Sequence, residues 1–115
     1  MQTDAASPNE AKSLVHLESF VVNLADSDQS AFLKVGIDLG IGQVGKKEPP
    51  IDKGSLLLAK IRDAVLSVLS TSQSADLLAP DGKAKLKQRL LEALRQQIPE
   101  LPVKEIYFTE FLVQR

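Results

Sequence analysis

Cysteine is absent from this sequence of 115 residues, and histidine occurs once, as His16. The first absence excludes thiol chemistry, disulfide bonds and zinc sites with thiolate ligands, although it assigns no cellular compartment. A single histidine also excludes a histidine-rich metal site and any mechanism that needs two imidazoles. His16 stands at the entrance of a predicted strand, where we interpret it as an ordinary half-exposed side chain.

An excess of positive charge is also missing, because 14 Lys and Arg residues face 15 Asp and Glu residues. The sequence therefore lacks the charge that supplies nonspecific affinity for phosphates, and we expect no nucleic-acid partner. Low net charge permits homo-oligomers because copies repel each other little. Basic residues cluster in one segment, where they alternate with leucines. This pattern favours a solvent-exposed helix face over a binding site for an acidic partner. The cluster comprises Lys83, Lys85, Lys87, Arg89 and Arg95.

Long apolar runs are missing too, since no segment approaches the roughly 20 residues that span a bilayer. The N-terminus lacks the features of a signal peptide, so we expect the chain as written to be soluble. Its length suits one domain. The first residues are polar and include Pro8, which predicts a flexible linker over 1–13 and a single domain over 14–115.

Two neighbouring segments have the alternation of β-strands. The clearer one, over 33–41, predicts a strand with an apolar face formed by Leu33, Val35, Ile37, Leu39 and Ile41. In a preceding strand over 14–24, alternation separates Phe20, Val22 and Leu24 from Leu17, Val21 and Asn23. The short turn between the strands, which we expect Asp26 and Asp28 to cap, favours an antiparallel hairpin.

Two later segments have the apolar spacing of helices. The first predicted helix covers 55–70 and follows an irregular loop over 42–55 that is rich in Gly and Pro. After a single short turn over 75–79, Asp81 is placed to cap a second helix. The buried stripe of that helix is expected to be Leu86, Leu90, Ala93, Leu94 and Ile98.

The last predicted strand begins at Val103, after Pro99 and Pro102 have ended the second helix. Strict alternation separates Val103, Tyr107, Phe111 and Val113 from Ile106, Phe108 and Leu112. Because both faces are then apolar, we expect this strand to be covered on both sides. The order strand, strand, helix, helix, strand predicts an α+β fold, with a small, mainly antiparallel sheet and the helices packed on one face.

Motifs for catalysis or cofactor binding are missing from the sequence. It contains no nucleophile-elbow pattern, and no Gly-Lys-Ser/Thr follows the glycines between 36 and 45. The carboxylate pairs Asp26 with Asp28 and Glu105 with Glu110 lack the spacing of an acid and base or of a calcium loop. We predict a protein that is not an enzyme and needs no cofactor or metal. A small enzyme with a dispersed site would instead require a deep polar pocket containing a strongly shifted carboxylate.

Several segments, in the same order along the chain, resemble a known family. The first is FVVNL at 20–24, and the last is YFTEFLVQ at 107–114. Between them lie RDAVLSVLS at 62–70 and DGKAKLK at 81–87, which are similar to the central helix and to the opening of the second helix of that family. The chain resembles the flagellar basal body-associated protein family FliL over nearly all of its predicted domain.

The resemblance implies a stomatin/prohibitin-like (SPFH-like) fold and a non-enzymatic role at the bacterial flagellum basal body. It implies a periplasmic domain of a single-pass inner-membrane protein, whose transmembrane helix is absent from this chain. It further implies a homo-oligomeric ring around the flagellar stator subunits, which holds the stator in its torque-generating state and supports swimming and swarming motility. The alternative is a membrane-scaffold domain of the same fold without a flagellar role.

Candidate contact residues follow from apolar or glycine-bearing surface beyond what one small core requires. Glycine within a strand can mark a bend or the close approach of another backbone, including that of a second subunit. We expect contacts with another subunit or with the stator at Asn23, Lys34, Gly36, Asp38, Phe108 and Phe111.

Overall fold

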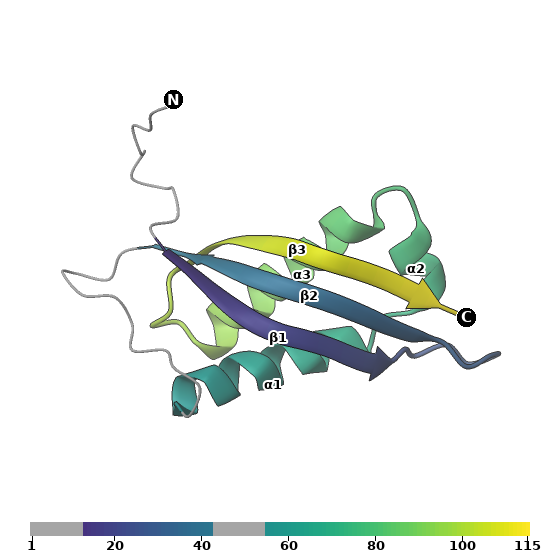
Figure 1. Cartoon of the computed structure of the whole chain (residues 1–115), viewed down its shortest axis with the longest axis horizontal. Coiled ribbons are helices and arrows are strands. Elements are labelled where there is room, and N and C mark those ends of the chain that lie inside the picture. The colour runs from purple at the N-terminus through teal and green to yellow at the C-terminus, as the bar shows by residue number, and fades with distance from the viewer. Residues whose placement is uncertain (1–12, 43–54) are drawn as a thin grey trace.

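The computed structural model describes residues 13–42 and 55–115, which form an antiparallel sheet with helices on one side (Figure 1). The elements in chain order are β1 (Ser13–Asn23), β2 (Phe32–Ile41), α1 (Leu56–Ser70), α2 (Ser74–Leu78), α3 (Gly82–Gln97) and β3 (Val103–Gln114). The predicted α+β class and antiparallel sheet are confirmed. Of the predicted linker and loop, residues 1–12 and 43–54 lie outside the described residues.

Strand β2 is central and pairs antiparallel with both β1 and β3. The predicted apolar face of β2 is confirmed, because its five members are completely buried: Leu33, Val35, Ile37, Leu39 and Ile41. They form one core with helix residues that include Ile61, Leu69 and Leu90. Burying each such side chain contributes about 1.5–3 kcal/mol to stability, so this layer holds the helices on the sheet.

The predicted faces of β1 are wrong at Leu17. Leu17 pairs with Ile37 and Phe20 pairs with Val35, so two residues of β1 stand opposite the single residue Gly36. This β-bulge adds one residue to the strand, which places Leu17 on the same face as Phe20. Both side chains are buried in the core.

The prediction that β3 is covered on both sides is wrong for the same reason. The pairing of β3 with β2 shifts at two places, where Lys104 and Thr109 are extra residues. The two bulges bring one set of apolar residues to the helix side: Val103, Ile106, Phe108, Phe111 and Val113. Tyr107 and Leu112 are left on the opposite side, where they are exposed.

Of the three described helices, α1 alone begins with a hydrogen-bonded side-chain cap. Ser55 caps α1, because its hydroxyl accepts a hydrogen bond from the backbone N–H of Leu58 at 3.0 Å. The short turn predicted over 75–79 is a five-residue helix, α2, so the described residues form three helices where two were predicted. Asp81 stands at the cap position of α3 but makes no side-chain cap; its carboxylate pairs with Lys85 at 3.2 Å instead.

Gly82 allows α3 to begin directly against α2. A side chain at this position would collide with the backbone carbonyl oxygens of Asp76 and Leu77. The first turn of α3 can therefore approach α2 only because residue 82 has no Cβ.

Asp26 joins the β1–β2 turn to α2 rather than capping the turn by itself. Its carboxylate accepts a hydrogen bond from the backbone N–H of Ser74 at 2.8 Å and a second from the Ser74 hydroxyl. The Nε of Arg115 donates to the same hydroxyl oxygen at 3.0 Å. The turn, the start of α2 and the C-terminus therefore meet at one polar cluster.

Candidate interaction surfaces

The six predicted contact residues lie on two separate surfaces. Asn23, Lys34, Gly36 and Asp38 belong to the side of the sheet that faces away from the helices, which we call the open face. Phe108 and Phe111 lie on the helix side, next to α3. The structure therefore brings four of the six together and separates them from the remaining two.

The open face holds most of the exposed large apolar side chains among the described residues. Eight large apolar residues are exposed among the described residues, and five of them lie on this face. Their exposed fractions are 62% for Leu14, 65% for Val21, 38% for Phe32, 44% for Tyr107 and 49% for Leu112. A concentration of apolar side chains on one sheet face is typical of a surface that binds another protein.

Polar side chains at the middle of the open face are paired with one another. The Ser19 hydroxyl donates to Glu110 Oε1 at 3.0 Å, and Lys34 Nζ lies 3.5 Å from Glu110 Oε2. A hydrogen bond of 2.7 Å joins His16 Nδ1 to Asp38 Oδ1. These contacts are solvent-exposed and contribute little to stability, but they order the side chains that a partner would meet.

Gly36 lies beneath the contact between Ser19 and Glu110. A Cβ at residue 36 would collide with the Thr109 Oγ1 atom. Since β1 and β3 flank β2, their side chains can meet across it only where the central strand carries no side chain of its own. The need for glycine at residue 36 is therefore explained by contacts within this chain, without a second subunit. The glycine also leaves no side chain of β2 at the centre of the open face.

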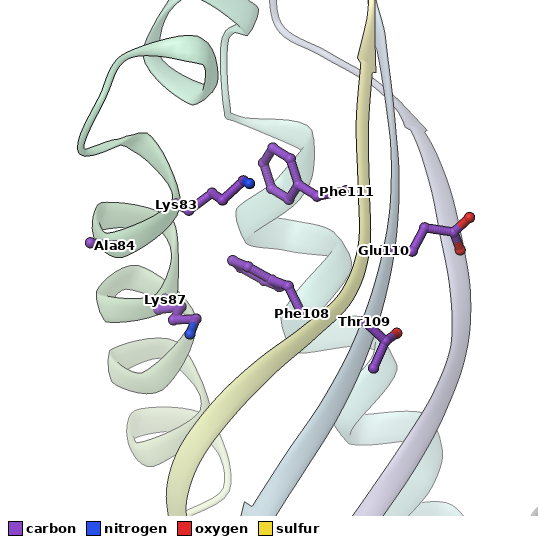
Figure 2. A pocket seen from close by; sticks show the side chains of 7 residues that line it. All are labelled: Lys83, Ala84, Lys87, Phe108, Thr109, Glu110 and Phe111. Atoms are coloured by element: carbon purple, nitrogen blue, oxygen red, sulfur yellow. The ribbon is translucent and has the colours of Figure 1, made fainter.

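A groove separates α3 from β3, and we call it the α3–β3 groove (Figure 2). It has a volume of about 520 Å³. The Phe108 and Phe111 rings lie in it with centroids 5.4 Å apart and planes tilted by 48°. Lys83 Nζ is 5.2 Å from the Phe111 centroid, and Lys87 Nζ is 5.5 Å from the Phe108 centroid, so each ammonium is within cation–π range.

Thr109 and Glu110 also border this groove, but their side chains point away from the helix (Figure 2). Glu110 is engaged with Ser19 and Lys34 on the open face. The charged groups that face the groove are therefore the two lysines of α3. Sequence reasoning missed Lys83 and Lys87, which it treated as part of a solvated face. The spacing of the two lysines by one helical turn was the available signal.

No cluster of three or more metal-ligating side chains occurs within residues 13–42 and 55–115. The pKa of the Asp26 carboxyl is lowered, chiefly by the hydrogen bond from the Ser74 hydroxyl, and hydrogen bonding to Lys85 lowers the pKa of Asp81. A lowered pKa keeps a carboxyl ionised and makes it a poor general acid. Within the same ranges, no helix has both the length and the apolar character needed to cross a bilayer.

Comparison with known proteins identifies the family. The family model described as flagellar basal body-associated protein FliL matches residues 14–114. The chain belongs to the FliL family. A curated relative from Aquifex aeolicus (strain VF5), named flagellar protein FliL, is 32% identical over 101 aligned residues.

The match to that relative covers 83% of this chain and 56% of the relative, so the chain spans about half the length of the FliL protein it matches. Both comparisons describe flagellar proteins. The FliL family is associated with the flagellar basal body, and neither comparison supports the alternative of a membrane-scaffold domain without a flagellar role.

Proposed function

We propose that this FliL domain is a non-enzymatic component of the flagellar motor. In this proposal it lies in the periplasm as part of a single-pass inner-membrane protein. It forms a homo-oligomeric ring around the flagellar stator and holds the stator in its active, torque-generating state, which supports swimming and swarming motility. The family's association with the basal body supports motor components as the partners, and the ring and the stator contact are the finer parts of the proposal.

The open face is the observation that supports this role best. It carries the exposed apolar side chains and four of the predicted contact residues: Asn23, Lys34, Gly36 and Asp38. We assign the contacts with another subunit and with the stator to this face. Phe108 and Phe111 would act separately, through the α3–β3 groove.

The energy required for such a role is small. A ring that binds the active stator more tightly than the closed one shifts the equilibrium by the difference between the two affinities. A tenfold shift needs a difference of about 1.4 kcal/mol. Burial of one or two exposed apolar side chains on the open face would supply that amount.

The fold class allows an architectural proposal as well. We propose that the sheet and its helix layer belong to the stomatin/prohibitin (SPFH-like) type, in which similar domains act as membrane scaffolds. Superposition on an experimental structure of that type would test this directly. Matching strand order and helix placement support the proposal, and a different order contradicts it.

Site-specific photo-crosslinking in motile cells tests the function. Probes at Asn23, Lys34 and Asp38 of the natural protein sample the open face, and control probes at Lys60 and Glu92 sample exposed helix positions. Crosslinks from the open face to a second copy and to the stator's periplasmic segment are expected. Self-crosslinks without stator crosslinks would contradict the proposed stator contact. Equal crosslinking yields at open-face and control positions would contradict the assignment of this face.

A further inference from the structure

The outer edge of β3 runs beside the α3–β3 groove. In the sheet of described residues, β3 pairs with β2 alone, so the backbone groups along its other edge have no strand partner. A free edge can accept another strand, with backbone hydrogen bonds providing affinity and side-chain pockets providing specificity. Figure 2 shows the groove on this side of β3, with the side chains of Lys83, Phe108 and Phe111 within it.

The floor of the groove is apolar because Phe108 and Phe111 are only half-buried by the protein itself. The bulge at Thr109 lets both rings point to the same side of β3. A strand that extended the sheet would present every second side chain to these rings. The groove therefore favours a segment whose inward side chains include apolar ones.

The wall of the groove is positively charged. Neither Lys83 nor Lys87 forms an ion pair within the described part of the chain. The neighbouring basic residues are engaged elsewhere, since Lys85 pairs with Asp81 and Arg89 donates to Thr71 Oγ1 at 2.8 Å. The two unpaired ammonium groups therefore provide a charge that acidic side chains would complement.

The bulge at Thr109 also restricts what the edge can accept. It interrupts the regular hydrogen-bonding geometry of β3 and divides its regular pairing surface into two short stretches, residues 105–108 and residues 110–114. An added strand would be short, and backbone pairing alone would bind it weakly. Contacts with the two rings and the two lysines must then supply much of the affinity.

We propose that the α3–β3 groove and the edge of β3 form a binding site for an extended segment of another protein, with alternating apolar and acidic side chains. The segment would pair with residues 110–114 and place apolar side chains on Phe108 and Phe111. Its carboxylates would reach the ammonium groups of Lys83 and Lys87. This site is on a different surface from the open face, and it stands whether or not the domain forms a ring.

The test uses a phage-displayed library of random dodecapeptides, selected on the 115-residue chain. Enriched sequences that alternate Asp or Glu with Leu, Ile or Phe are expected. Fluorescein-labelled copies are then titrated with the wild type and with the double variant Lys83→Gln/Lys87→Gln. Binding should weaken about tenfold, since two surface charge contacts are lost, and it should also weaken with added salt.

The matched control is Lys60→Gln/Lys85→Gln, which removes the same charge from other exposed helix positions and should leave the affinity unchanged. Amide chemical shifts should move at residues 108–114 and along α3, and amide exchange should slow at the outer edge of β3. These shifts are measured on folded protein, so a variant that merely unfolds is recognised.

Four results would overturn the proposal. The first is a selection that enriches no common sequence, and the second is equal loss of affinity in the two double variants. The third is a shift map confined to the open face. Self-association of the peptide-free chain that disappears in Lys83→Gln/Lys87→Gln would identify a second copy as the occupant and would also contradict the proposed partner.

Discussion

Single side chains tie together segments that are far apart in this sequence. Arg62 of α1 stacks over the Phe20 ring of β1 with its guanidinium carbon 4.1 Å from the ring centroid. The same guanidinium donates to the backbone carbonyl of Glu18 at 3.0 Å, inside the bulge of β1. Arg62 thereby gives a hydrogen-bond partner to a carbonyl within the irregular part of β1, and it fixes α1 against the edge of the sheet.

Asp26 makes the stability of the domain depend on pH. Its folded-state pKa lies below the usual value of 3.8, chiefly because the Ser74 hydroxyl donates to it. A group with a depressed pKa stabilises the fold above the unfolded-state pKa, and this contribution is lost as the pH falls through the folded-state pKa. We expect Asp26→Asn to lower the free energy of unfolding at pH 7, with the difference from wild type shrinking below pH 3.8.

Urea denaturation at neutral and acidic pH measures this difference. Asp28→Asn is the control, because Asp28 is exposed two residues away in the same turn. A stability difference that stays constant across the acidic range would contradict the role assigned to Asp26.

Bulges decide which side chains of the edge strands enter the core. In β1, residues 18 and 19 together occupy the place of one residue opposite Gly36. In β3, Lys104 and Thr109 are the extra residues. Because side chains alternate with period two, each extra residue exchanges the faces on one side of it. Three bulges thus convert irregular apolar spacing into one continuous apolar face.

Two single-residue deletions in β1 should differ sharply. Deleting Ser19 removes the bulge and restores regular alternation, so Leu17 and Phe20 both stay in the core, and a loss below about 1 kcal/mol is expected. Deleting Val21, whose side chain is 65% exposed, breaks the alternation and turns core residues outward. That deletion should cost at least about 3 kcal/mol.

Chemical denaturation of the two deletion variants compares them directly, and each is the control for the other because both lose one residue. Equal losses of stability would show that the bulge does not set the faces of β1.

The whole domain presents two chemically different surfaces on opposite sides of the sheet. The open face is broad and apolar, with internally paired charges, while the α3–β3 groove is narrow and cationic. Among the described residues, helices cover one side of the sheet (Figure 1), and no described helix covers the other side. A domain built this way can contact two partners at once.

Replacing exposed apolar residues of the open face tests its assigned role. Val21→Ser/Leu112→Ser should leave the unfolding midpoint nearly unchanged, because both side chains are largely exposed. Self-crosslinking from a probe at Asn23 in cells should fall about tenfold, since the apolar area buried between subunits is reduced. The control Leu56→Ser/Leu78→Ser alters two exposed leucines of the helices.

Crosslinking yield and swimming speed are compared between these two double variants. If the helix variant loses as much crosslinking and speed as the open-face variant, the subunit contact does not lie on the open face.

Sequence reasoning succeeded where the pattern was local. The alternation of residues 33–41 predicted the central strand and its buried face, and the helical spacing after Leu56 and after Gly82 predicted α1 and α3. It failed at Leu17 and along β3, where alternation was assumed to be uninterrupted. It also gave no sign that Asp26 would bond to Ser74, because the two residues are 48 positions apart.

The candidate surfaces were predictable to a similar extent. Asn23, Lys34, Gly36 and Asp38 were predicted to be contact residues, and the structure places all four on one face. Phe108 and Phe111 were grouped with them, although they lie on the other side with the lysines of α3. Which side chains become neighbours across two elements depends on how the strands pair and how the helix packs on them. The sequence of one element alone does not specify either.

The amino-acid sequence by itself determined the three strands, the two long helices, the buried face of β2 and membership of the FliL family, because these depend on local periodicity and on residue order. Only the tertiary structure decided which side chains share a face, since a bulge forms when two strands pair and leaves no periodic signal of its own. It likewise decided that Lys83 and Lys87 stand over two aromatic rings beside a free strand edge. Those contacts join helix and strand, and they arise only once both elements pack on the same core.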